Sequence, residues 1–319
     1  MSLRPVFTLA LLLACLLLLL LTSLSLGSSG WLPPAHWHDP IQQSIVLELR
    51  LPRALAALAV GGLLALAGTL IQALTRNPLA DPYILGISGG AAVGGLFAIL
   101  LGLTAWMQQI SAALGAFGTL LLVIALAHGE GAWTRQRLLL TGVVLASALG
   151  AVITLLLALA PETALRGMLF WLMGDLSGAP APWLALGALG LLALLVLPWA
   201  RDLNILTRGA DSAMSLGVNV RALRWGAYLL AAIATALAVM TAGSIGFVGL
   251  LAPHLARLLV GADHRRALPA AILLGASLVM LADLLARTLI APQQLPAGAL
   301  LALIGAPLFL ALLYREGRT

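Results

Sequence analysis

The stretch RNPLADPYILG, residues 76–86, interrupts a long run of apolar sequence, and a second interruption, GSIGFVGLLAPH, occupies residues 243–254. Each stretch places several helix-breaking residues among segments that are otherwise apolar. Irregular backbone that faced lipid would leave its peptide groups without hydrogen bonds. We therefore expect both breaks to face protein or a water-filled path, which is how a transport route is built.

The composition is that of an integral membrane protein. The 319 residues are 62% hydrophobic and only 9% charged, which excludes a soluble multidomain enzyme. The first apolar run, 6–26, follows Arg4 and is interpreted as a membrane span, since it has nearly the length of one and no Ala-x-Ala cleavage site follows it. Cys15 is the one cysteine, so neither a disulfide framework nor a thiolate metal cluster is expected.

The apolar runs predict an all-α, polytopic membrane protein with about ten transmembrane helices in a single domain, 1–319. The expected spans are 6–26, 54–74, 87–103, 110–127, 138–160, 183–200, 225–242, 245–260, 267–289 and 297–314.

The arginines set the expected orientation. With the amino terminus inside, the cytoplasmic segments hold Arg4, Arg76, Arg135, Arg137, Arg201, Arg208, Arg221, Arg224, Arg265, Arg266, Arg315 and Arg318, whereas the outer side keeps Arg50, Arg53, Arg166 and Arg287. This positive-inside bias predicts an even number of spans and two cytoplasmic termini. It also explains the formal charge of +6 without nucleic-acid binding.

The longest polar cytoplasmic stretch, about 201–224, contains a short predicted helix. Asp211 or Gly209 would begin it, Gly217 would end it, and a small apolar surface would come from Ala210, Ala213, Met214 and Leu216. Such a helix suits insertion into a groove of a partner. The alternative is a connector that lies on the membrane surface.

Three outer arginines contradict the local charge rule and need an explanation. Arg50, Arg53 and Arg287 could dock an acidic protein surface, because guanidinium groups pair with carboxylates bidentately. Alternatively, Arg287 could pair with Asp283 one helical turn away, and Arg50 with Glu48 or with lipid headgroups.

No phosphate-binding loop of the Gly-x-x-x-x-Gly-Lys-Ser/Thr type can be built here, since the sequence contains no lysine. If ATP energises transport, the ATPase is another chain, and this chain is not an enzyme.

Two hypotheses of other classes remain open. Ser88, in a Gly-x-Ser-Gly sequence, and His254 could serve as nucleophile and base of an intramembrane serine protease. His36, His38 and Asp39 could form an outer metal site that feeds a secondary metal transporter, although the surrounding tryptophans and prolines are more typical of an interfacial segment.

Taken together, several motifs make the chain resemble the permeases of ATP-binding cassette (ABC) importers for iron-siderophores, haem and vitamin B12. They are RLPR at 50–53, NPLADP at 77–82, GISG at 86–89, FWLMG at 170–174, SIGFVG at 244–249, PH at 253–254, DHR at 263–265 and GAP at 305–307.

The resemblance implies the type II ABC importer permease fold and a role for particular residues. The docking site for a binding protein falls on Arg50, Arg53 and Arg287. The coupling helix that meets the ATPase falls on about 207–220, and so on Arg208, Gly209, Ala210, Asp211, Ser212, Ala213, Met214, Leu216 and Gly217. One cytoplasmic gate falls on Asn77 and Leu79, and the second on Arg135 and Gln136, where the family has small hydroxyl residues.

The resemblance also implies the partners. They are a second permease subunit, most simply a copy of this chain, two cytoplasmic ABC ATPase subunits that hold ATP and Mg²⁺, and a periplasmic substrate-binding protein. The chain itself would bind no cofactor and no metal, and would lie in the inner, cytoplasmic membrane. An iron-siderophore is the expected cargo, with vitamin B12 or haem as the alternatives, and no polar cluster is expected that would hold the cargo tightly.

Overall fold

A computed structural model describes residues 4–127, 135–178 and 182–316. Its helices are α1 (Arg4–Ser25), α2 (Pro40–Ser44), α3 (Leu51–Thr75), α4 (Ile87–Leu100), α5 (Ala105–Ala127), α6 (Arg135–Leu159), α7 (Glu162–Leu172), α8 (Pro182–Val196), α9 (Ala200–Arg208), α10 (Ala210–Ser215), α11 (Val220–Ala242), α12 (Val248–Val260), α13 (His264–Thr288) and α14 (Ala297–Glu316). Shorter elements are the strands β1 (Leu26–Gly27) and β2 (Gly30–Trp31), the 3-10 turns η1 (Pro34–His36), η3 (Pro82–Leu85) and η4 (Leu197–Trp199), and the π-helical turn η2 (Ile45–Arg50).

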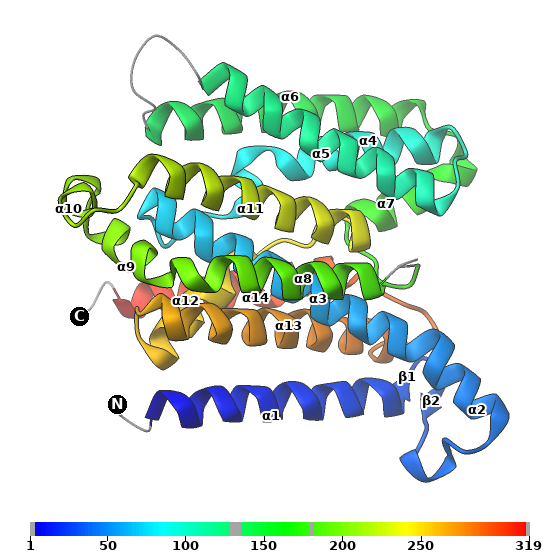
Figure 1. The fold of residues 1–319 in the computed structure, drawn as a ribbon. Coiled ribbons are helices and arrows are strands. Elements are labelled where there is room, and N and C mark those ends of the chain that lie inside the picture. The colour runs from blue at the N-terminus through cyan, green and yellow to red at the C-terminus, as the bar shows by residue number, and fades with distance from the viewer. Residues whose placement is uncertain (1–3, 128–134, 179–181, 317–319) are drawn as a thin grey trace.

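The all-α class is confirmed, and each of the ten expected spans corresponds to one helix. Seven helical stretches in the described part of the chain are long and apolar enough to cross a membrane: α1, α2–α3, α5, α6, α8–α9, α11 and α13. The other three expected spans, α4, α12 and α14, are shorter apolar helices. Both ends of the described chain lie at the same end of the bundle, which we call the terminal end (Figure 1). The even number of spans accounts for this.

Not every element was expected. The antiparallel hairpin β1–β2 and the short helices α2 and α7 lie at the opposite end of the bundle (Figure 1). Their sequences carry too little apolar periodicity to be separated from loops. The short helix expected within 208–217 is present as α10.

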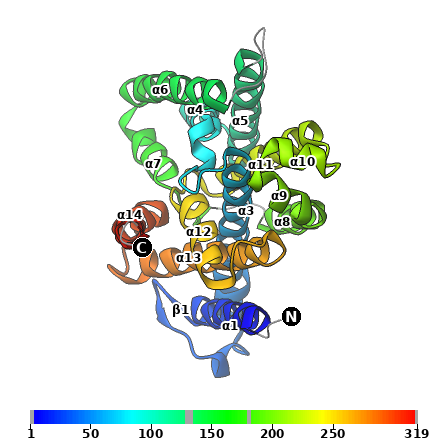
Figure 2. The same ribbon diagram turned by 90° about the vertical axis from the view of Figure 1, so that its left-hand side faces the viewer.

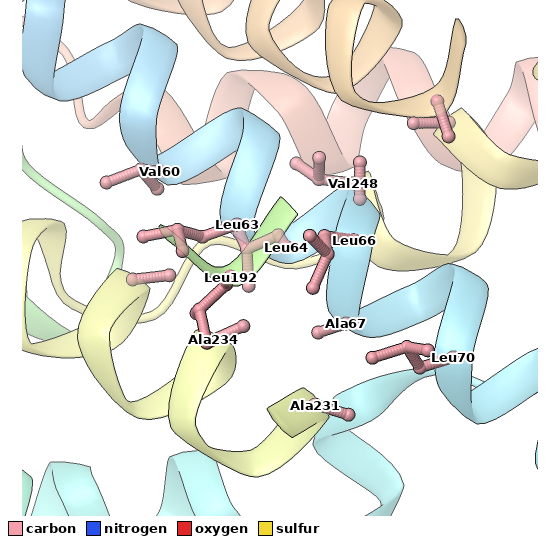
Figure 3. Close-up of a cluster of buried hydrophobic side chains, with 14 of the residues drawn as sticks. Val60, Leu63, Leu64, Leu66, Ala67, Leu70, Leu192, Ala231, Ala234 and Val248 are labelled. Atoms are coloured by element: carbon pink, nitrogen blue, oxygen red, sulfur yellow. The ribbon is translucent and has the colours of Figure 1, made fainter. Parts of the chain in front are cut away.

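Helix α3 is the centre of the bundle. It packs against α8, α11, α12 and α13, and a view along the bundle shows the other helices around it (Figure 2). Its apolar side chains make the core with residues of those neighbours: Val60, Leu63, Leu64, Leu66, Ala67 and Leu70 meet Leu192, Ala231, Ala234 and Val248 (Figure 3). Because α3 is apolar on all sides, it shows no narrow amphipathic stripe, as expected of a helix buried among helices.

Glycines allow α3 to approach its neighbours closely. A Cβ atom at Gly68 would overlap the carbonyl oxygen of Gly249 in α12, and one at Gly61 would overlap the carbonyl oxygen of Gly275 in α13. Small residues at such crossings are the usual means of packing membrane helices. The backbone of α3 therefore lies directly against two neighbouring helices.

Substitution of Gly68 tests this packing. Gly68→Ala would force α3 and α12 apart and should destabilise the folded protein by about 1–3 kcal/mol, as overpacking does. The matched control is Gly150→Ala in α6, because a Cβ atom there meets nothing within 4 Å. The measurement is the thermal unfolding midpoint in detergent, and equal midpoints for the two variants would contradict the packing described.

Candidate functional site

The first break forms a tight turn directly after α3, at the terminal end of the bundle. Arg76 ends the helix in the left-handed conformation, with φ of 47°. The side-chain oxygen of Asn77 then accepts a hydrogen bond of 2.9 Å from the backbone N–H of Leu79, which is 43% exposed. The carboxylate of Asp81 accepts one of 2.8 Å from the N–H of Tyr83 and so begins η3. Burial raises the pKa of the Asp81 carboxyl to about 6.

A single tyrosine joins this turn to the second break. The hydroxyl of Tyr83 donates to the carbonyl oxygen of Ile245 at 3.0 Å and accepts from the N–H of the same residue at 3.1 Å. Gln72, in the last turn of α3, adds to this connection. Its amide nitrogen donates to the carbonyl oxygens of Gly249 and Leu250, both at 3.2 Å. The expectation that the breaks face protein is thus met, because each break supplies hydrogen bonds to the other.

The second proposed gate lies at the start of α6. Arg135 and Gln136 are the first residues of that helix, and their side chains lie outside the part that the structure describes. Their role as a gate stays a prediction. Asn77 and Leu79 lie together in one exposed turn, as a gate at the terminal end requires, but the gating role is likewise a prediction.

The segment expected to meet an ATPase projects from the terminal end (Figure 1). Gly209 and Gly217 flank α10, and both have positive φ. Ala213 is fully buried beneath the helix, whereas Met214 is 56% and Leu216 is 67% exposed. Two large apolar side chains therefore point away from the bundle.

A polar clamp ties this segment to α13. The amide nitrogen of Asn204, in α9, donates to Asp263 at 2.7 Å, and its oxygen accepts from the backbone N–H of His264 at 2.9 Å. The hydrogen bond from Asn204 lowers the pKa of the Asp263 carboxyl. Asp263 also begins α13 by accepting from the N–H of Arg265. The clamp fixes α9, and with it the base of α10, to the start of a long membrane helix.

At the opposite end, the three expected docking arginines are bound internally. Arg287 pairs with Asp283 at 3.2 Å and donates to the backbone carbonyl of Ser23 in α1 at 2.9 Å. Arg53 pairs with the same fully buried Asp283 at 2.7 Å and donates to Gln294 at 2.7 Å.

Arg50 is 4% exposed and donates to the carbonyl oxygens of Leu24 and Gly30 and to the hydroxyl of Ser29 at 2.9–3.1 Å. The alternative reading of Arg287 as an i,i+4 partner of Asp283 is confirmed. The guanidinium groups join α1, α3 and α13, and such buried pairs are costly to break from one side. Their docking role stays a prediction.

A cavity at the opposite end of the bundle was missed in the sequence analysis. About 350 Å³ in volume, it is lined by residues that include Gln108, Gln109, Asp175 and Thr241. The expectation that no polar cluster holds the cargo tightly stays a prediction. Two features of the sequence could have pointed to this cavity. They are the adjacent Gln108 and Gln109 at the start of an apolar run and the Asp-x-Ser sequence that follows Gly174.

The residues proposed for a serine protease or for a metal site have other contacts in the structure. The ring of His254, in α12, packs edge-on against Phe309 of α14, with centroids 5.9 Å apart. Ser88 is the second residue of α4. Asp39 caps α2 by accepting from the N–H of Ile41, and the described residues contain no group of three or more His, Cys, Asp or Glu side chains that could hold a metal ion.

The chain is similar to known transport permeases over nearly its whole length. Residues 14–315 match the FecCD transport family. The hemin transport system permease protein HmuU of Yersinia pestis is 40% identical, over 98% of this chain and 97% of its own. The vitamin B12 import system permease protein BtuC of Escherichia coli O157:H7 is 39% identical, over 95% of this chain and 93% of its own. An uncharacterised ABC transporter permease protein of Bacillus subtilis, YvrB, is 41% identical over 88% of this chain and 81% of its own.

Solved structures agree. A metal-chelate type ABC transporter in an inward-facing conformation superposes with a TM-score of 0.86 at 36% identity, over 97% of this chain and 99% of that one. PsaBC from Streptococcus pneumoniae shares the fold alone, with a TM-score of 0.56 at 18% identity over 87% and 92% of the two chains. The resemblance expected from the motifs is confirmed, and the chain belongs to the FecCD transport family of ABC transporter permeases.

Proposed function

We propose that this chain is the membrane-spanning permease subunit of an importer that moves a metal chelate, an iron-siderophore in the first instance, across the cytoplasmic membrane. The observation that carries the proposal is the likeness, over nearly the whole chain, to a metal-chelate type ABC transporter. Haem and vitamin B12 are the alternative cargoes, because relatives of equal similarity are named for each. The chain acts as a single permease domain over 1–319, and no bond of the cargo is made or broken.

The proposed complex contains a second copy of this chain, two ABC ATPase subunits that hold ATP and Mg²⁺, and a binding protein that delivers the cargo. Exposed apolar side chains support contact with lipid or a second copy: in α6, Leu140, Val144, Leu155 and Leu159 are each more than half exposed. The arginine distribution supports a cytoplasmic terminal end, with both termini inside and the docking surface outside. This permease binds no cofactor of its own.

In the proposed mechanism, closure of the ATPase dimer on ATP displaces α10 and opens the path on alternate sides. The turn at Asn77 and Leu79 acts as one cytoplasmic gate, and Arg135 and Gln136 form the second cytoplasmic gate. Since the turn is joined through Tyr83 to the second break, both breaks respond together.

Uptake into proteoliposomes tests the function. The permease, reconstituted with its ATPase and binding protein, should import a ferric siderophore only when ATP is supplied. Hemin and cyanocobalamin are offered in parallel. Import of one of these two alone would correct the cargo but keep the function, whereas import driven by an ion gradient without ATP would refute the ABC mechanism.

Truncation of the exposed side chains of α10 tests the coupling site. Met214→Ala with Leu216→Ala should leave the fold intact but reduce co-purification of the ATPase at least tenfold, because apolar area at a small interface is lost. The matched control is Leu289→Ala, which removes a 59% exposed leucine at the opposite end. If the double variant retains the ATPase as the control does, the coupling site lies elsewhere.

A change at Gln294 tests docking without disturbing the buried arginines. Gln294→Glu preserves an acceptor for Arg53 but adds a negative charge beside it, which would repel an acidic partner. Affinity for the binding protein should fall about tenfold, more at low salt than at high salt. Gln294→Ala is the control, since it removes the same hydrogen bond without adding a negative charge and should keep the affinity. Unchanged binding by the glutamate variant would argue against docking at Arg53.

A further inference from the structure

A different cavity, of about 240 Å³, lies at the terminal end of the bundle. It is bounded by the last turn of α3 and the turn that follows it, by α9, by α12 and by the start of α13. Helices α3 and α12 end beside this cavity, and α13 begins there. The ends of spanning helices lie at the level of the lipid headgroups. The cavity is therefore placed where a headgroup can enter it.

Two arginines from different elements line this cavity. Arg76 follows α3 and is exposed, and Arg257 comes from the last turn of α12. None of the described residues in the lining is acidic. The neighbouring carboxylate, that of Asp263, accepts a hydrogen bond from Asn204, caps the start of α13 and lies beside Arg265. A hollow lined by charges of one sign concentrates their field, so this cavity should attract an anion.

The polar groups beside the arginines are held in place and add a hydrogen-bond donor. Asn77 is exposed, and its amide nitrogen carries two N–H groups, whereas its side-chain oxygen already accepts from the N–H of Leu79. The ring of His264 is fixed through its Nδ1 atom, which lies 2.7 Å from the side-chain oxygen of Asn204. The wall is thus ordered without a bound ligand.

The backbone at Arg76 suggests that its side chain has a particular use. Arg76 ends α3 in the left-handed conformation, with φ of 47°, where glycine is the usual residue. Its Nη1 atom lies 3.9 Å from the point that a Cβ atom of Gly209 would occupy, at the start of α10. An anion bound by Arg76 would therefore lie between the turn at Asn77 and the coupling segment.

The surroundings favour the phosphate group of a lipid over an anion dissolved in water. Leu258 and Leu259 follow Arg257 directly in α12 and are 54% and 52% exposed, so apolar surface adjoins the guanidinium group. Phosphate oxygens accept paired hydrogen bonds from arginine, and acyl chains need apolar contacts. Basic pockets between membrane helices on the cytoplasmic side bind anionic headgroups in this way.

We propose that this cavity binds the phosphate group of an anionic phospholipid of the cytoplasmic leaflet, and that Arg76 and Arg257 hold it. The proposal goes beyond the transport function and assumes only that the terminal end is cytoplasmic. A bound headgroup would join α12 to the turn at Asn77. It would stabilise that turn without contacting the cargo.

Lipid binding to the purified, full-length permease in detergent tests the site. The probe is dioleoylphosphatidylglycerol, and it is compared with dioleoylphosphatidylcholine, which has a phosphate diester but no net charge, and with inorganic phosphate. Phosphatidylglycerol alone should raise the thermal unfolding midpoint, because a ligand that binds only the folded protein stabilises it. Arg76→Gln should lower the affinity for phosphatidylglycerol about fivefold, as the loss of one arginine at an anionic surface does.

The matched control is Arg221→Gln. Arg221 is an exposed arginine in the first turn of α11, at the same end of the bundle, and it does not line the cavity. This variant loses the same charge and should keep the affinity.

A second pair of variants retains both arginines. Ala262 is exposed and lines the cavity, so Ala262→Asp places a carboxylate at its edge and should also weaken the binding of phosphatidylglycerol. Ala262→Asn has nearly the same shape without the charge and should bind as the unchanged protein does.

Other results would overturn the proposal. Equal losses for Arg76→Gln and Arg221→Gln would indicate attraction by the general surface charge, and stabilisation by inorganic phosphate as strong as that by the lipid would indicate a site for free phosphate. If Arg76→Gln and Ala262→Asp bind the lipid normally but no longer co-purify with the ATPase, the arginines bind an acidic side chain of that partner instead. Uptake of a chelate plays no part in these measurements, so failure of the proposed function would be seen separately.

Discussion

The hydroxyl of Tyr83 satisfies both backbone groups of Ile245, and the rest of the fold is arranged around that contact. Within a bilayer, a peptide group that leaves a helix must find another partner, because no water is at hand. Here two interruptions, far apart in the sequence, satisfy each other within the protein. Gln72 adds two further hydrogen bonds to the same place. The chain can thus be irregular at depth without exposing polar backbone to lipid.

That contact depends on close packing. Tyr83 reaches Ile245 only because α12 lies directly against α3, which Gly68 and Gly249 permit by having no side chains at the crossing. Apolar association gives little preference for one helix pair over another in lipid, so shape decides which helices meet. The close packing of α3 on α12 and the hydrogen bonds between the two breaks therefore depend on each other.

Much of the architecture could be predicted from the sequence, because span length and arginine asymmetry are local signals. The ten spans and the short helix α10 were found in this way, and the motifs indicated the family. The partners of the arginines could not be predicted, since Arg53 meets Asp283 across 230 positions of sequence. The cavity at Gln109 was missed for the same reason, because its wall combines residues of four helices that are far apart in the sequence.

Helix α13 is attached at both ends. Asn204 binds its first turn to the coupling segment, and Asp283 and Arg287 bind its last turns to α3 and α1. Its 25 residues extend over about 37 Å at 1.5 Å per residue, which is the thickness of the apolar bilayer and more. A helix is stiff along its axis, so a shift imposed on one face of the membrane is conveyed to the other by a single rod. The two surfaces at which partners are proposed to bind are thereby mechanically linked without any movement having to pass through the cargo path.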